Sequence, residues 1–151
     1  MPDALYYEDF SPGEVAEYGG IDVSADEIVA FALQFDPQPF HIDAEAARAL
    51  TGGLIASGWH TCALLLKMNS DAFLARAATV DETGIEDVRW ERPVRPGDRL
   101  HVRRSTLARR VREDRTGEIE FLYEVVNRDG AVAMSQRSLL LVEQRPQPNG
   151  N

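Results

Sequence analysis

The sequence has few of the residues that most often mark a metal, redox or disulfide site. It contains one cysteine, Cys62, and three histidines in 151 residues. A single cysteine excludes an internal disulfide and a CxxC motif, and no two histidines have the helical spacing of a metal site. His41 and Asp43 would offer only two ligands. The sequence therefore predicts no metal site, and its cysteine content is typical of a reducing, cytoplasmic setting.

Long hydrophobic runs are also missing. The longest nearly apolar stretch, Cys62–Met68, is far too short to cross a bilayer. Residues 1–5 contain no basic segment followed by an apolar one, as a secretory signal would. We therefore expect neither a membrane partner nor a secretory leader.

Positive charge is scarce in the first third of the chain. Residues 1–50 contain eleven acidic residues and one basic residue, Arg48, whereas ten of the sixteen basic residues lie between Arg89 and Arg115. The net charge of −9 argues against nucleic acid as a partner. The basic segment could receive an anionic ligand such as a phosphorylated cofactor, or its arginines could simply occupy the solvated faces of strands.

Two helices are predicted in the first third. Ser24 and Glu27 have the spacing of a capping box, and the apolar residues that follow predict a helix of about three turns that ends at Phe35. A second short helix is expected over Ala44–Leu50, with Asp43 as its N-cap.

The segment Asp36–Asp43 joins these helices and carries the first candidate site. Pro37 and Pro39 fix their own backbone and push each preceding residue toward extended geometry, so we expect neither helix nor strand here. The stiff bend would let Asp36 and His41 face one small volume, where a carboxylate and an imidazole suit general acid–base catalysis. The alternative is an ordinary proline-rich loop with a capping Asp and a surface His.

A helix that is apolar on every face is predicted from Trp59 to Met68, with Lys67 as its only charge. Such a helix is typically buried. Ser57 is a natural N-cap, and Gly58 would let a ligand approach the backbone closely. The unpaired N–H groups and positive dipole at this helix start suit an oxyanion site.

The second half of the chain has the alternating pattern of antiparallel strands. We expect strands around 85–91, 99–111, 119–125 and 132–142, with a hairpin at Asp129-Gly130 and a frayed tail from about Arg145. Together, these elements predict one α+β domain over residues 1–151, in which a curved antiparallel sheet wraps around the long central helix.

The chain resembles the MaoC-like dehydratases, which include the (R)-specific enoyl-CoA hydratases and have the hot-dog fold. Asp36–His41 matches the Asp-x4-His motif of that family, and Gly52–Trp59 matches the lead-in to its central helix. Val88–Trp90 together with Arg92–Asp98 resembles its first long strand and turn. The resemblance covers roughly residues 6–142.

The resemblance implies a hydratase that interconverts trans-2-enoyl and (R)-3-hydroxyacyl thioesters of CoA, or of an acyl carrier protein, with no cofactor beyond that substrate. Asp36 and His41 would hold the water and move its protons, and the backbone N–H of Gly58 would polarise the thioester carbonyl. The substrate-binding candidates are Ser57, Trp59, Gln38 and Phe40. Many members have Asn in place of Gln38 and His in place of Ser57, which would alter the pocket. A homodimer or a dimer of dimers is implied as well.

Two other functions remain open. A hot-dog acyl-CoA thioesterase commonly carries a carboxylate on the central helix, but Ser57–Ser70 contains no Asp or Glu. A non-catalytic acyl-thioester binding module would not need an acid–base pair. Outside the candidate site, we expect His60 to be a hydrogen-bonded core residue, Cys62 to serve packing and His101 to be exposed, while Trp90 lies in the core or a pocket wall.

Overall fold

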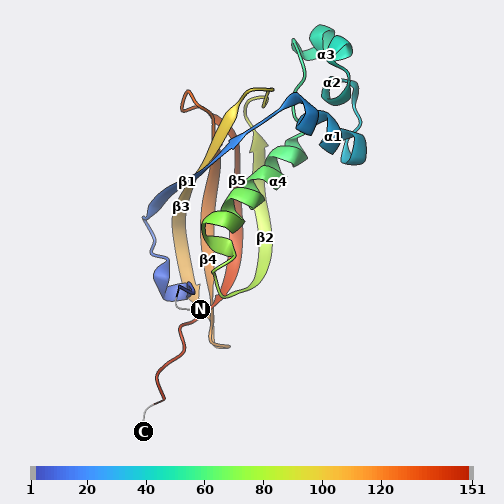
Figure 1. The fold of residues 1–151 in the computed structure, drawn as a ribbon. Coiled ribbons are helices and arrows are strands. Elements are labelled where there is room, and N and C mark those ends of the chain that lie inside the picture. Colours follow the sequence, from blue (N-terminus) through green and yellow to red (C-terminus); the bar gives the residue numbers. More distant parts are fainter. Residues whose placement is uncertain (1–2, 150–151) are drawn as a thin grey trace.

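The computed structural model describes residues 3–149, which contain one five-stranded antiparallel sheet and a central helix, α4, lying across it (Figure 1). The strand order is β1-β3-β4-β5-β2, so β1 and β2 are the edges. This confirms the predicted α+β hot-dog architecture. The strands are β1 (Val15–Asp22), β2 (Thr79–Trp90), β3 (Arg99–Val111), β4 (Thr116–Val126) and β5 (Val132–Glu143).

Three of the helices gather at one end of the sheet, namely α1 (Ala25–Phe35), α2 (Pro39–Ile42) and α3 (Ala44–Thr51). Figure 1 shows α1, α2 and α3 together, close to the start of α4. The capping box that begins α1 is confirmed, since the Ser24 hydroxyl accepts from the Glu27 N–H at 3.2 Å. The elements are η1 (Tyr7–Asp9), α1 (Ala25–Phe35), α2 (Pro39–Ile42), α3 (Ala44–Thr51), α4 (Gly58–Asn69) and a π-helical turn, η2 (Ser70–Leu74).

The expectation that Asp36–Asp43 contains no helix is wrong. Pro39–Ile42 forms a one-turn helix, and Pro39 occupies its first position. Proline is tolerated there because the missing N–H would have no intrahelical partner anyway. Asp43 caps α3 as predicted, accepting from the Glu45 N–H at 2.9 Å and the Ala46 N–H at 3.1 Å.

Strand β1 was not predicted, and β2 begins at Thr79 rather than Ile85. The β1 pattern is interrupted by Gly19 and Gly20, both at positive φ, where the register with β3 shifts. A Cβ on Gly19 would lie 2.5 Å from the Met68 sulfur. Glycine is needed here because β1 passes directly against α4.

The core lies between α4 and the face of the sheet that it covers. The prediction that α4 is buried on every side is wrong, because Trp59 is 62% and Leu66 is 55% exposed. Only one side of the helix packs on the sheet, so its other apolar residues stay accessible. Side chains that are fully buried in the core include Phe10, Leu65, Leu100, Val102, Phe121, Val125, Met134 and Leu140.

The C-terminal residues 145–149 are exposed and have no regular structure, as expected for a tail. Arg145 nevertheless forms an ion pair with Asp9 at 2.7 Å. The last two residues of the predicted tail, Gly150 and Asn151, lie outside the described residues. Within residues 3–149, no helix has the length and hydropathy needed to cross a membrane.

Candidate active site

Three chain segments bring the predicted acid–base pair and the start of α4 together. Asp36 is the C-cap of α1, and its N–H donates to the Ala32 carbonyl at 2.8 Å. His41 lies on α2, whose one-turn helix turns its side chain back toward Asp36. Ser57 and Gly58 begin α4. The predicted meeting of Asp36, His41 and the helix start is therefore present in the fold.

His41 is held in one orientation. Its Nδ1 lies 2.6 Å from the Ile55 carbonyl oxygen, and its Nε2 lies 3.3 Å from Asp36 Oδ2. A carbonyl can only accept, so Nδ1 carries a proton, and Nε2 is the nitrogen that has the lone pair whenever the ring is neutral. His41 is 4% exposed. The alternative of a surface histidine is therefore wrong.

The Asp36 carboxylate receives a hydrogen bond at each oxygen. The Ser57 hydroxyl donates to Oδ2 and the Gln38 amide donates to Oδ1, both at 2.7 Å. These two bonds hold the pKa of Asp36 below its ordinary value. Asp36 is therefore ionised at neutral pH and available as a proton acceptor.

Ser57 occupies the N-cap position of α4, but its side chain makes no capping hydrogen bond. Ser57 therefore holds the predicted N-cap position but does not cap the helix with its side chain, because its hydroxyl donates to Asp36 instead. The Gly58 N–H has no acceptor within residues 3–149, as is usual for the first turn of a helix. The positive end of the α4 dipole adds to this free donor.

Trp90 packs directly on Gly58. Its indole N–H donates to the Gly58 carbonyl at 2.9 Å, and a Cβ on Gly58 would lie 2.5 Å from the Trp90 ring. Trp90 also meets Trp59 edge to face, with ring centroids 5.4 Å apart. Residue 58 must be glycine for Trp90 to lie in this place.

A cavity of about 390 Å³ opens beside these groups. Both Trp59, a predicted substrate-binding candidate, and Trp90, expected in the core or a pocket wall, line this cavity. Ser57 and Phe40 do not line it: Ser57 supports Asp36, and the Phe40 ring lies edge-on to His41 at 4.5 Å. The lining consists of Asp36, Gln38, His41, Ile55, Ala56, Gly58, Trp59, Thr61, Trp90, Glu91, Arg92, Pro93 and Val94.

Several lining residues were not predicted as site residues, among them the polar Thr61 and the charged Arg92. Thr61 follows Gly58 by three positions, so helical spacing alone would have placed it on the same face. Arg92 belongs to the segment that resembles the family's first strand and turn. No sequence signal set it apart from the other arginines.

His60 and His101 differ from expectation in detail. His60 is buried as predicted and stacks on Phe31 at 4.7 Å, but its Nδ1 has no hydrogen-bond partner within residues 3–149. His101 is half-buried on β3 rather than exposed. Cys62 is half-buried, and burial raises the pKa of its thiol, which leaves it unreactive. No cluster of three potential metal ligands occurs in the described part of the chain.

Comparison with known proteins identifies the family. Residues 9–127 match the model of the MaoC-like domain. The crystal structure of a MaoC-like dehydratase from Rhodospirillum rubrum is 36% identical, with a TM-score of 0.88, and the match covers 95% of this chain and 100% of that one. YdeM of Bacillus subtilis, an uncharacterised protein, is 29% identical over 121 residues, which are 80% of this chain and 86% of YdeM.

The fold extends to a more distant relative. The (R)-hydratase PhaJ1 from Pseudomonas aeruginosa, solved without ligand, is 22% identical with a TM-score of 0.77, and the match covers 98% of this chain and 96% of that one. At this identity the likeness shows a common fold. The family model and the Rhodospirillum structure support a hydratase or dehydratase in general terms. From its sequence and its structure, this chain belongs to the MaoC-like domain family.

Proposed function

We propose that the protein interconverts trans-2-enoyl and (R)-3-hydroxyacyl thioesters of CoA. The observation that carries this proposal is the placement of Asp36 and His41, 3.3 Å apart, on the same cavity as the start of α4. Membership of the MaoC-like domain family supports it, as does the similarity in fold to an (R)-hydratase.

The acid–base pair suits a bound water. The Asp36 carboxylate and the neutral His41 Nε2 are both acceptors, and a water between them can donate one proton to each. In hydration the water oxygen bonds to C3 while one of its protons passes to the pair. The C2–C3 π electrons move toward the thioester carbonyl, and a proton returned to C2 completes the addition. Dehydration is the reverse.

The start of α4 supplies the other requirement of this reaction. Charge develops on the thioester oxygen as water adds to C3, and a fixed donor placed there lowers the barrier. Gly58 lines the cavity, and its N–H has no intramolecular acceptor in the described chain. Arg92 on the same cavity offers a positive charge for the phosphate groups of CoA.

The assembly that we propose is a homodimer joined at β2. This strand is an edge of the sheet, and it exposes Val80, Ile85 and Trp90. The neighbouring α4 exposes Trp59 and Leu66. An accessible strand edge beside exposed apolar side chains favours pairing with a second chain.

Crotonyl-CoA separates this proposal from its two alternatives. Loss of the enoyl-thioester absorbance without release of free thiol is the expected result. Thiol release would make the protein a thioesterase, because Asp36 and His41 would then activate water against the carbonyl carbon. Binding without either change would make it a non-catalytic acyl-thioester module.

A further inference from the structure

His60 lies in the first turn of α4, two positions after Gly58, and the proposed reaction does not use it. It does not line the active-site cavity. Its ring instead stacks on Phe31 of α1, with the ring centroids 4.7 Å apart and the ring planes 8° from parallel. His60 is 6% exposed, and its Nδ1 has no hydrogen-bond partner within residues 3–149. The His60 side chain therefore joins α4 to α1 by packing against Phe31.

The charge state of His60 follows from its surroundings. Burial lowers the pKa of the imidazole, and the Glu27 carboxylate of α1 raises it by a smaller amount. The ring is therefore neutral at neutral pH and meets Phe31 as an uncharged aromatic side chain. Two stacked rings resist closer approach and sideways displacement, so they define the local spacing of the two helices.

A hydrogen bond joins the same two helices at the candidate active site. Ser57, three residues before His60, donates to Asp36 Oδ2 at 2.7 Å. Asp36 is the C-cap of α1 and follows Phe31 by five residues. At 1.5 Å per residue, the stack and the hydrogen bond hold α1 at points about 7 Å apart along its axis. Two contacts at this separation restrict both the distance and the tilt of α1 relative to α4.

The placement of α1 matters because the reacting groups are divided between the helices. Asp36 ends α1, whereas Gly58, the proposed oxyanion donor, begins α4. A substrate that contacts both groups needs them at a fixed separation, and an error of about 1 Å can lower the rate about a hundredfold. Phe31 also packs on Phe35, the residue before Asp36, with ring centroids 5.1 Å apart. A shift of Phe31 into the space left by a missing His60 ring would therefore displace Asp36.

We propose that His60 is a positioning residue, whose ring, acting through Phe31, sets the place of Asp36 relative to the start of α4. Its effect on the rate rests on the proposed hydratase function, but the contact itself can be tested without turnover. The shape of the ring carries this role, so phenylalanine should replace histidine at position 60. Neither the ring nitrogens nor the charge of the imidazole is required.

The first measurement is the pKa of Asp36, read from the ¹³C shift of its carboxyl carbon during a pH titration of the folded protein. His60→Ala should let Asp36 move away from the Ser57 hydroxyl, so the pKa of Asp36 should rise toward its ordinary value. Phe31→Ala removes the other half of the stack and should raise this pKa as well. His60→Phe keeps a ring against Phe31 and should leave the pKa of Asp36 at the wild-type value.

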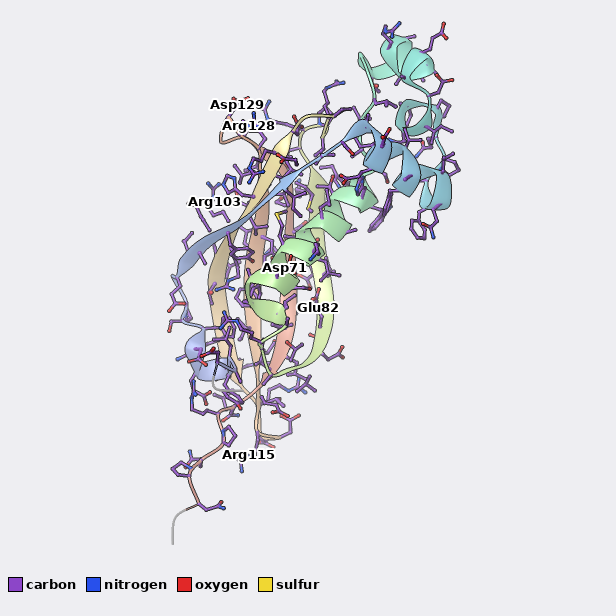
Figure 2. The ribbon with its side chains drawn as sticks, in the orientation of Figure 1. Asp71, Glu82, Arg103, Arg115, Arg128 and Asp129 are labelled. Atoms are coloured by element: carbon purple, nitrogen blue, oxygen red, sulfur yellow. The ribbon has the colours of Figure 1, made fainter. Side chains whose placement is uncertain are left out.

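Met68→Ala is the matched control for lost packing in α4. Met68 is 2% exposed and lies near the C-terminal end of this helix. Figure 2 shows Asp71, which follows α4 by two residues, far from α1. Truncation of Met68 should therefore lower the melting temperature but leave the pKa of Asp36 unchanged.

Turnover of crotonyl-CoA gives the second readout. His60→Ala should lower kcat by a factor of about 10 to 100 with little change in KM, because the reacting groups are displaced. His60→Phe should keep the wild-type kcat. In a protein that already carries Ser57→Ala, His60→Ala should have a smaller further effect, because the hydrogen bond that the stack aligns is absent.

A pKa of Asp36 that stays in place in both His60→Ala and Phe31→Ala would overturn the positioning role, whatever the rate. An equal rise in His60→Ala and His60→Phe would also overturn it, since the effect would then belong to the imidazole charge and not to the ring. A wild-type protein without hydratase activity would overturn the proposed function alone, and the pKa of Asp36 in the variants would still decide the role of His60.

Discussion

His41 Nε2 and Asp36 Oδ2 lie 3.3 Å apart, and both are acceptors when the imidazole is neutral. Two acceptors this close need a proton between them, from a protonated ring or from a water that bonds to both. The Ile55 carbonyl fixes the tautomer that creates this arrangement. The Asp36–His41 pair can therefore bind a proton donor at the wall of the cavity.

Asp36→Asn and His41→Gln should each lower kcat with crotonyl-CoA by a factor of about 10² to 10⁴, because each removes one proton acceptor. Thermal unfolding should show that both variants fold. Asp43→Asn is the matched control: Asp43 caps α3 outside the cavity, and Asn serves nearly as well as a cap. Wild-type rates in both site variants would rule out the assigned pair.

Ser57→Ala should move the acid limb of the pH–rate profile to higher pH. The Ser57 hydroxyl makes the largest contribution to the lowered pKa of Asp36, so its removal raises that pKa and Asp36 becomes protonated at a higher pH. The measurement is kcat/KM for hydration between acid and neutral pH. Gln38→Leu should shift the limb in the same direction. A limb that stays in place, or moves to lower pH, would contradict the role given to Ser57.

Gly58→Ala keeps the backbone N–H but should displace it, and kcat should fall by up to a factor of about 10² to 10³, the cost of losing an oxyanion donor. Its Cβ would lie 2.5 Å from the Trp90 ring, so the ring or the helix start must shift. Gly84→Ala on β2 is the control, because no atom lies within 4 Å of the Cβ it would add. Equal kcat values for the two variants would contradict the need for a precisely placed donor at the start of α4.

Val80→Glu should convert the dimer to a monomer, since it places a charge on the edge of β2 where a second chain would pair. Sedimentation equilibrium measures the mass directly. Val111→Glu changes an equally exposed valine at the end of β3 and should leave the mass unchanged. A wild-type protein that sediments as a monomer would contradict pairing at β2.

The Asp36 and His41 pair could be predicted because it depends on residues that are close together in the sequence. Two prolines force the bend between the acid and the imidazole, and Ser24 and Glu27 mark the helix that leads into it. The strands in the second half of the chain could also be predicted from their alternating pattern, because each strand buries one face.

The parts that could not be predicted depend on contacts between distant segments. Ser57 has the sequence context of a helix cap, yet its hydroxyl bonds to Asp36, 21 positions away. Strand β1 carries two glycines that weaken its pattern, and only the approach of Met68 explains Gly19. A further cavity is lined by residues of α4, β2, β4 and β5, and no local pattern indicates that these four elements meet.

Hydratase activity through Asp36 and His41 is best tested by the hydration of crotonyl-CoA by wild type and Asp36→Asn, with the chirality of the product determined. We expect (R)-3-hydroxybutyryl-CoA from wild type, no release of free CoA, and a rate at least about a hundredfold lower for the variant. An (S) product, free CoA as the main product, or equal rates for the two proteins would contradict this assignment.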